Sequence, residues 1–129
     1  MQQRSGGCLC GAVHFTVLGE PLRVGMCHCH DCRRTSGSGF SFFGVWERAL
    51  YEGSGELATF QGRSFCPVCG SRVVLLRQAE AEIMLGTLDE APTDLIPTYQ
   101  IWTPRREHWL IGLHWCEQFD RDAFPVNGS

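Results

Sequence analysis

The sequence predicts an all-β domain of small antiparallel sheets that zinc holds together. Short apolar or alternating segments recur along the 129 residues, with glycine and proline between them, and no long segment has the 3.6-residue period of a helix. Seven of the eight cysteines also lie in three tight clusters, which is a spacing typical of metal ligands. We therefore expect a single zinc-binding domain over residues 1–129.

The expected strands follow one another with short turns between them. Residues 11–18 alternate between apolar and polar side chains, as a half-buried strand does, and Gly19-Glu20-Pro21 ends the segment. Residues 63–77 predict a hairpin whose turn is Cys66-Pro67-Val68-Cys69-Gly70, where proline fixes one φ angle and glycine permits another. The return strand of this hairpin is expected at 73–76, and further strands at 40–46, 57–60, 83–88, 99–103 and 109–113.

Three smaller expectations complete the reading of the fold. A helical turn or two is expected only around residues 31–34. The four tryptophans are expected in the core, with the alternative that one of them lines a pocket, and the tail 127–129 is expected to fray.

The charge pattern argues against some classes of partner. The net charge is −3, and all eleven basic residues are arginines without a basic run, so the positive surface of a nucleic-acid-binding protein is missing. Arginine instead suits the capture of carboxylates or phosphates through paired hydrogen bonds. No segment resembles a signal peptide or a membrane-spanning helix, which predicts a cytoplasmic protein with reduced cysteines and no membrane partner.

Four cysteines form the expected ligand set for one zinc ion: Cys8, Cys10, Cys66 and Cys69. Cys8 and Cys10 form a Cys-x-Cys pair, and Cys66 and Cys69 form a Cys-x-x-Cys pair; we call each such pair a cysteine hook. Two hooks far apart in the sequence can complete one tetrahedral site, which contributes directly to folding. A different pairing of hooks is an alternative. A redox dithiol is another, but no βαβ pattern surrounds these cysteines as that motif requires.

Cys27, Cys29 and Cys32 form a second expected zinc site, and they are the expected catalytic residues. Three thiolates within six residues leave one coordination position for water or a substrate atom. A thiol that entered this position would be held as a thiolate by the charge of the metal. The alternative is a closed site whose fourth ligand is His28, His30 or Cys116. Cys116 is otherwise expected to be a buried free thiol.

Three side chains next to these cysteines are candidates for binding a substrate or cofactor. Arg33 and Arg34 directly follow the last cysteine, so a short turn can present a guanidinium group to an anionic ligand, or either arginine can form an ordinary salt bridge. His28 lies between two cysteines and can act as an acid or base, or donate a hydrogen bond. The alternative for His28 is a solvated side chain.

Three segments are informative as a set: Gly-Cys-Leu-Cys-Gly-Ala-Val at 7–13, Cys-His-Cys-His-Asp-Cys-Arg-Arg-Thr-Ser-Gly at 27–37, and Arg-Ser-Phe-Cys-Pro-Val-Cys-Gly-Ser at 63–71. With these segments the chain resembles the glutathione-dependent formaldehyde-activating enzyme family, which also includes centromere protein V. Residues 86–89 and Trp109-Leu110 fit the C-terminal half of the family pattern. The chain is shorter than the formaldehyde-activating members, and Gln100 stands where many relatives carry histidine.

The resemblance implies a tent-like all-β fold with two zinc ions, a structural one at the four-cysteine set and a catalytic one at Cys27, Cys29 and Cys32. It also implies a carbon–sulfur lyase that joins formaldehyde and glutathione into S-hydroxymethylglutathione. The expected partners are therefore a low-molecular-weight thiol such as glutathione and a small aldehyde. A non-catalytic carrier of glutathione or its adduct, and a zinc-stabilised protein-interaction module, are the alternatives, because one fold serves several functions.

Overall fold

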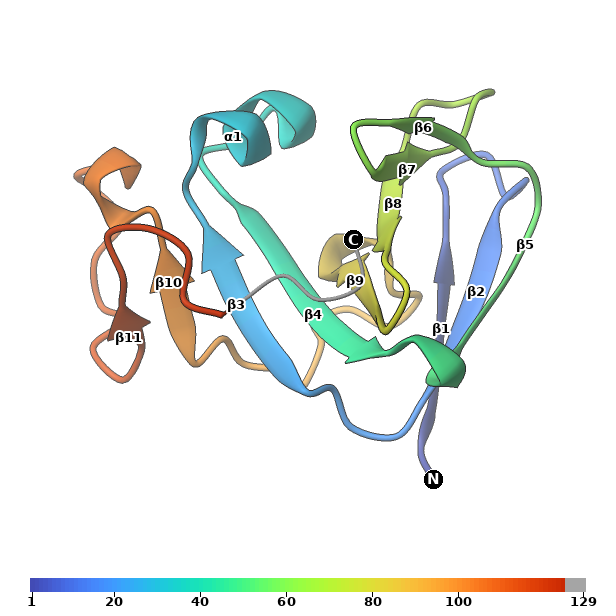
Figure 1. The fold of residues 1–129 in the computed structure, drawn as a ribbon, viewed down its shortest axis with the longest axis horizontal. Helices are drawn as coiled ribbons and strands as arrows, with labels where there is room; N and C mark the ends of the chain where they lie inside the picture. The colour runs from blue at the N-terminus through green and yellow to red at the C-terminus, as the bar shows by residue number, and fades with distance from the viewer. Residues whose placement is uncertain (125–129) are drawn as a thin grey trace.

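The structure is a computed structural model that describes residues 1–124, and two β-sheets make up most of it (Figure 1). The three-stranded sheet has the order β1–β2–β5 and contains β1 (Gln3–Gly7), β2 (His14–Leu18) and β5 (Tyr51–Ser54). The second sheet has the order β11–β10–β3–β4–β9–β8–β7–β6. Its strands are β3 (Arg23–Cys27), β4 (Ser41–Glu47), β6 (Ala58–Phe60), β7 (Arg63–Phe65), β8 (Arg72–Leu76), β9 (Glu80–Met84), β10 (Tyr99–Ile101) and β11 (Glu117–Gln118).

Helical structure is short. The helix α1 spans His30–Ser36, and three 3₁₀ helices are η1 (Arg48–Leu50), η2 (Leu85–Thr87) and η3 (Thr103–Arg105). In Figure 1, β3 and β10 lean to one side and the three-stranded sheet stands on the other, which gives the ribbon an open, tent-like outline. None of the helices in the described residues is long and apolar enough to cross a membrane.

The prediction of an all-β fold is confirmed, and the expected strands at 11–18, 40–46, 57–60 and 99–103 correspond to β2, β4, β6 and β10. The expected hairpin at 63–77 is β7 and β8, and the strand expected at 83–88 is β9, which starts and ends earlier. The sheets are not antiparallel throughout, because β10 pairs in parallel with both β3 and β11. The tail 127–129 lies outside the described residues.

Four strands were not predicted from the sequence: β1, β3, β5 and β11. β1, β3 and β5 contain glycines, which depress strand propensity, and in β1 and β3 a glycine lies where the fold needs the space. An added Cβ at Gly25 in β3 would lie 2.6 Å from Cζ of Tyr99, the residue opposite it on β10. An added Cβ at Gly6 in β1 would lie 2.4 Å from the carbonyl oxygen of Thr87. Close packing against neighbouring segments therefore explains these glycines.

The prediction of a strand at 109–113 is wrong. Trp109 and Ile111 are 71% and 82% exposed, and the segment pairs with no strand within residues 1–124. Trp115 is also exposed and Trp102 is half-buried, so of the four tryptophans only Trp46 lies in the core as expected. The apolar residues of this segment thus belong to the surface beside η3.

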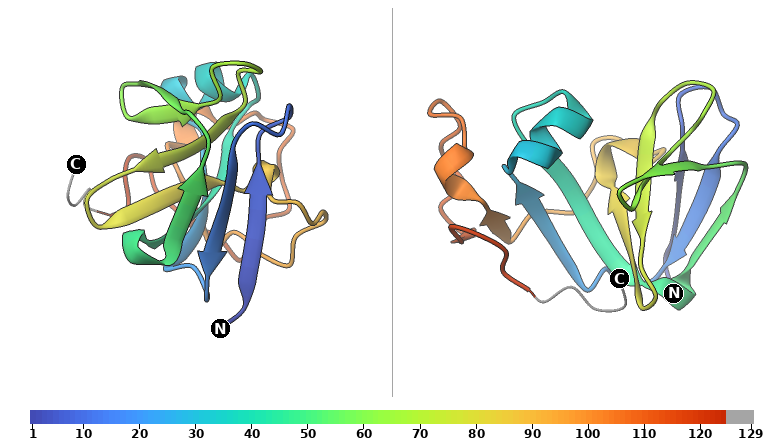
Figure 2. Two further views of the ribbon diagram at one scale, coloured as in Figure 1. Left: turned by 90° about the vertical axis from the view of Figure 1, so that its right-hand side faces the viewer. Right: turned by 45° about the horizontal axis from the view of Figure 1, so that its top comes forward.

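The central strand β4 is buried on both faces, which explains its nearly continuous apolar sequence. Trp46 contributes to a core that also contains Phe15 of β2 and Ile83 of β9, so this core joins the two sheets. On the other face, Phe43 and Val45 pack in a second core with residues of β3 and β10. Figure 2 shows the three-stranded sheet lying against the strands β8 and β9, where the first core is found.

The ion pair between Arg23 of β3 and Glu80 of β9 spans β4. Nη1 and Nη2 of Arg23 donate to Oε2 and Oε1 of Glu80 at 2.9 and 2.8 Å, and both side chains are largely buried. The hydrogen bonds from Arg23 lower the pKa of Glu80. The pair therefore contributes its full stability above the ordinary pKa of glutamate, and this contribution is lost as the pH falls through the lowered value.

We expect the substitution Glu80→Gln to lower the free energy of unfolding by about 1–3 kcal/mol at neutral pH, because the largely buried guanidinium of Arg23 loses its charged partner. Urea denaturation of both proteins, repeated at decreasing pH, measures this difference. It should shrink on the acidic side, since only the wild type loses the pair by protonation. A difference that stays constant down to acid unfolding would contradict the linkage.

Candidate functional site

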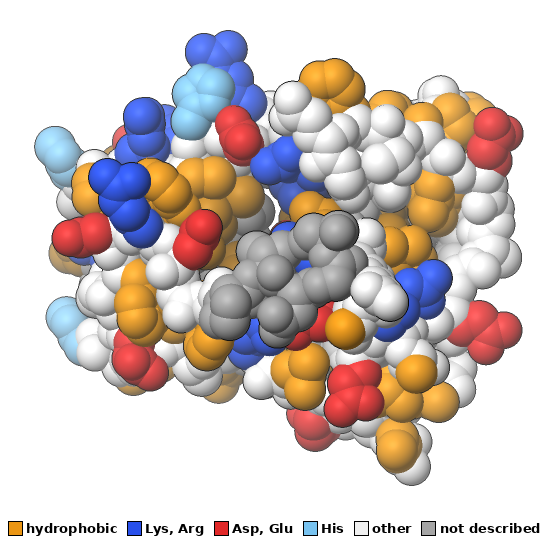
Figure 3. Space-filling view, viewed as in Figure 1, with side chains coloured by type: hydrophobic (Ala, Val, Ile, Leu, Met, Phe, Trp, Pro, Cys, Tyr) orange, Lys and Arg blue, Asp and Glu red, His pale blue; other side chains and the backbone are white. Residues whose placement is uncertain are grey.

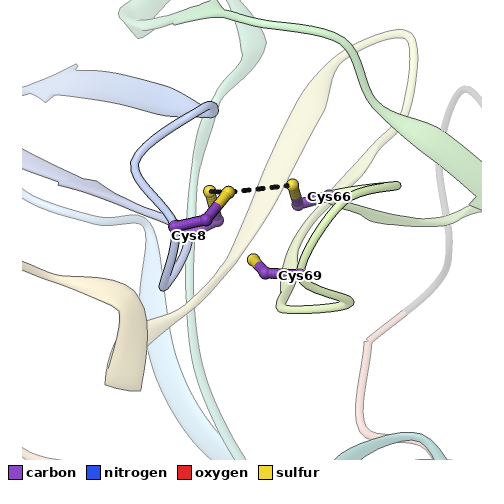
Figure 4. A group of neighbouring side chains, drawn as sticks. Cys8, Cys66 and Cys69 are labelled. Atoms are coloured by element: carbon purple, nitrogen blue, oxygen red, sulfur yellow. Dashed lines mark hydrogen bonds between the residues drawn. The ribbon is translucent and has the colours of Figure 1, made fainter.

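A four-cysteine cluster joins the start of the chain to the central hairpin. Cys8 and Cys10 lie in the turn between β1 and β2, and Cys66 and Cys69 lie in the turn between β7 and β8. Figure 4 shows the side chains of Cys8, Cys66 and Cys69 pointing towards one another. All four sulfur atoms lie within 4.8 Å of one another. The sulfurs of Cys8 and Cys10 are 3.6 Å apart, and those of Cys10 and Cys66 are 3.7 Å apart.

These distances fit a tetrahedral metal site. Four sulfurs at about 2.3 Å from a zinc ion are separated by about 3.8 Å from each other. Backbone N–H groups also donate to the sulfurs, from Val13 to Cys8 at 3.2 Å and from Val68 to Cys66 at 3.4 Å. The hydroxyl of Ser71 lies 3.3 Å from Sγ of Cys69 and, as the largest cause, lowers the pKa of that thiol to about 5. The surroundings of Cys69 thus favour its thiolate, which is the form that binds metal.

A three-cysteine cluster forms where β3 passes into α1. Cys27 is the last residue of β3, Cys29 is the N-cap of α1, and Cys32 lies in its first turn. Their sulfurs lie within 4.8 Å of one another, and the backbone N–H of Cys32 donates to Sγ of Cys29 at 3.3 Å. The cluster could hold a metal ion, and it is built from one short segment rather than from two distant ones.

Hydrogen bonds among the three thiols shift the pKa values of Cys27 and Cys29 in opposite directions. Hydrogen bonds from Cys27 and then from Cys32 lower the pKa of Cys29, whereas the hydrogen bond to Cys29 is the main cause that raises the pKa of Cys27. One thiolate, at Cys29, is therefore stabilised by its two protonated neighbours. A metal ion would displace the remaining protons, so its binding to this cluster is expected to be pH-dependent.

None of the three residues expected as a possible fourth ligand joins this cluster within residues 1–124. His30 is exposed, and its Nδ1 lies 3.1 Å from Oδ1 of Asp31. Cys116 is buried, as expected for a free thiol, and its Sγ donates to the carbonyl oxygen of Pro97 at 3.3 Å. Three cysteine side chains therefore converge here, and the described part of the chain adds no fourth potential ligand to them.

His28 is fully buried, so the alternative of a solvated side chain is wrong. Its Nε2 lies 2.7 Å from Oε1 of Gln100, which is also fully buried and lies on β10. The ring packs against Phe40, and burial, as the largest cause, lowers the pKa of His28. The backbone N–H of His28 donates to the carbonyl oxygen of Ile101 at 3.1 Å. His28 thus fastens the three-cysteine cluster to β10, and sequence spacing gave no sign that Gln100 is its partner.

Two cavities lie beside the three-cysteine cluster. The Cys29 cavity has a volume of about 380 Å³ and is lined by Cys29, Arg63, Trp102 and Arg105 among others. The Trp109 cavity has a volume of about 610 Å³ and is lined by Arg33, Arg34, Arg105 and Trp109 among others. Arginine and histidine side chains gather on this part of the surface, near α1 and the segment after β10 (Figure 3).

Arg33 and Arg34, the two arginines that the sequence proposed as ligand-binding residues, have different surroundings in the structure. Nη1 of Arg33 forms an ion pair with Oε1 of Glu107 at 2.7 Å and also donates to the carbonyl oxygen of Gly39, so Arg33 is already engaged. Arg34 is exposed at the edge of the Trp109 cavity. Arg63 and Arg105 also line the Cys29 cavity. Arg63 begins the cysteine segment 63–71 but was not expected to bind a ligand, and Arg105 lies outside all three cysteine segments.

Trp102, which lines the Cys29 cavity, has an unusual backbone conformation. It is one of two non-glycine residues in the described chain with a positive φ angle, at 58°, a conformation that costs free energy for most side chains. Its indole N–H donates to Oδ1 of Asp122 at 2.9 Å, and the guanidinium of Arg121 stacks on the ring. Strain of this kind is common where a side chain is held for function.

The fold and the two clusters define a class: a small β protein with two cysteine sites that could each hold a metal ion. The family model for the glutathione-dependent formaldehyde-activating enzyme matches residues 3–105, and the chain belongs to this family. The match includes all seven clustered cysteines and ends at Arg105. Formaldehyde activation is therefore the activity that its family membership indicates.

The comparison with solved structures supports the fold. A crystal structure of a Rhodobacter sphaeroides protein aligns with a TM-score of 0.55 and 21% sequence identity, over 72% of this chain and 97% of that chain. No curated protein matches the chain significantly.

We expect the substitution Gln100→Met to lower the free energy of unfolding by about 1–3 kcal/mol, because the buried imidazole of His28 loses its hydrogen bond. Chemical denaturation measures the change. Gln78→Met is the matched control, since Gln78 is exposed in the turn between β8 and β9 and its substitution should have little effect. Equal stability of the Gln100→Met variant and the wild type would show that the pair is unimportant for the fold.

Proposed function

We propose that this protein is a zinc-dependent carbon–sulfur lyase that joins a low-molecular-weight thiol to a small aldehyde, as in the formation of S-hydroxymethylglutathione from glutathione and formaldehyde. The observation that carries the proposal is the three-cysteine cluster, which opens at Cys29 into a cavity of about 380 Å³. Within residues 1–124 no fourth protein ligand joins it. Family membership supports the same chemistry.

In this proposal Cys27, Cys29 and Cys32 hold the catalytic zinc ion. Zinc bound there supplies a positive charge that lowers the pKa of a substrate thiol and increases its nucleophilicity. The protein keeps its ligands in place through the N–H of Cys32, which donates to Sγ of Cys29, and through the His28–Gln100 hydrogen bond behind them. In the reaction the substrate sulfur forms a bond to the aldehyde carbon, and the thiol proton ends on the former carbonyl oxygen.

The four-cysteine cluster has a structural role in this proposal. Its four ligands complete a tetrahedral site and leave no position for substrate. Each of its two hooks belongs to a different sheet, so a zinc ion there would fasten the two sheets to each other within one domain. Reduced thiolates and bound zinc are typical of a cytoplasmic protein, which is the compartment we propose.

The metal content of two variants tests this division of roles. Cys29→Ser should keep the fold and retain the zinc of the four-cysteine cluster, so that mass spectrometry under native conditions finds one ion per chain instead of two. Cys66→Ser should lose the ion that joins the two sheets and should unfold at a much lower temperature. A Cys66→Ser protein with unchanged thermal stability would contradict the structural assignment.

Exchange NMR on glutathione and formaldehyde tests the activity. We expect the zinc-loaded protein to accelerate the interconversion of free thiol and hemithioacetal, and Cys29→Ser to remove the acceleration, because one ligand of the proposed catalytic ion is lost. Saturable binding of glutathione without acceleration would instead indicate a carrier. Absence of both binding and acceleration would leave the protein-interaction module as the better hypothesis.

A further inference from the structure

Four arginines line the two cavities, and they differ in whether a carboxylate neutralises them. Arg33 is paired with Glu107 at 2.7 Å, and Nη2 of Arg63 lies 3.4 Å from Oδ2 of Asp31. Arg34 and Arg105 have no carboxylate within 4.0 Å in the part of the chain that the structure describes. The charge of these last two arginines is therefore available to a ligand.

Arg105 is the one of these two that lines both cavities, whereas Arg34 lines only the Trp109 cavity. The Cys29 cavity is lined by one side chain of the three-cysteine cluster, that of Cys29. Among the arginines without a carboxylate partner in residues 1–124, Arg105 is thus the one that shares a cavity with Cys29.

The backbone of Arg105 is held firmly although its side chain is exposed. Arg105 ends η3, where its N–H donates to the carbonyl oxygen of Trp102 at 3.1 Å. At the start of η3, both the N–H and the hydroxyl of Thr103 donate to the carbonyl oxygen of Phe119, at 3.2 and 3.3 Å. A guanidinium on a fixed backbone loses less conformational freedom when it binds a ligand, which favours affinity.

The carboxylates of the Cys29 cavity are already engaged. Asp31 contacts Arg63 and His30, and Asp122 accepts the indole N–H of Trp102. A ligand carboxylate placed near either aspartate would be repelled, so the arrangement of charges directs an anionic group towards Arg105.

We propose that Arg105 binds a carboxylate of the thiol substrate and makes the protein select thiols that carry one. The inference rests on the proposed function, since it places the substrate sulfur at the three-cysteine cluster. Guanidinium and carboxylate groups match in a planar, bidentate geometry, which gives affinity and direction at the same time. Glutathione carries two carboxylates, whereas 2-mercaptoethanol carries none. Arg105 therefore distinguishes the two thiols by their carboxylates, whereas the three-cysteine cluster would bind the sulfur of either one.

The test compares both thiols in the wild type and in Arg105→Gln, with the exchange of each thiol with formaldehyde as the first readout. Binding of S-methylglutathione, measured by calorimetry, is the second readout and does not depend on turnover, because this compound has the carboxylates but no free thiol. Arg48→Gln is the matched control: it removes the same charge at η1, where Arg48 stacks on Tyr51 and lines neither cavity.

We expect Arg105→Gln to weaken the binding of S-methylglutathione by about tenfold and to raise the glutathione concentration for half-maximal exchange similarly. Exchange with 2-mercaptoethanol should be unchanged, and Arg48→Gln should match the wild type. Arg105→Lys keeps the charge and should recover part of the binding.

Three results would overturn the inference: unchanged binding in Arg105→Gln, an equal loss of exchange for both thiols, or no measurable binding of S-methylglutathione by the wild type. Failure of the proposed function has a different signature, since the wild type would then accelerate exchange of neither thiol. In that case the calorimetric comparison still decides whether Arg105 binds carboxylates.

Discussion

The four-cysteine cluster is the constraint on which the arrangement of the two sheets depends. Four sulfurs within 4.8 Å of one another cannot all be thiolates unless a cation neutralises their repulsion. Two of them belong to the turn that joins β1 and β2, and two to the turn that joins β7 and β8, so the cluster connects one sheet to the other. The apolar core behind it, with Phe15 from one sheet and Ile83 from the other, is the second connection. A metal ion bound by these cysteines would therefore connect the two sheets at the same place as the apolar core does.

The three-cysteine cluster depends on a different kind of support. Its ligands come from one short segment, so its geometry is fixed by the end of β3 and the first turn of α1 rather than by distant segments. What holds this segment in place is β10, through the backbone hydrogen bond from His28 to Ile101 and the buried side-chain pair of His28 and Gln100. A buried imidazole in this position is costly unless it is hydrogen-bonded, and Gln100 provides that bond. The His28–Gln100 pair therefore links the position of the candidate catalytic cysteines to the position of β10.

The sequence was more informative about which cysteines lie together than about the residues around them. Cysteine spacing is local chemistry, so Cys27, Cys29 and Cys32 could be grouped without knowing the fold. Gln100 and Arg105 could not be placed, because parallel pairing of β10 with β3 brings them to the site from a distant part of the sequence. The strand expected at 109–113 failed for a related reason: Trp109 and Ile111 satisfy a strand pattern, but tertiary structure leaves them on the surface. β3 was not predicted because it contains Gly25, and glycine weakens a strand pattern. The ring of Tyr99 leaves no space for a side chain at this position.

The two clusters are also connected through the hairpin that carries Cys66 and Cys69. Arg63 on β7 reaches Asp31 in the first turn of α1, and Nη1 of Arg72 on β8 donates to Oγ1 of Thr35 at 2.7 Å. Both arginines belong to strands that flank the turn of the four-cysteine cluster, and both of their partners lie on the helix that contains Cys32. An exposed ion pair alone contributes little, but two contacts from one rigid hairpin restrict the position of a seven-residue helix. A metal ion in the first cluster would therefore fix the hairpin and, through these arginines, the wall of the cavity in which Cys29 lies.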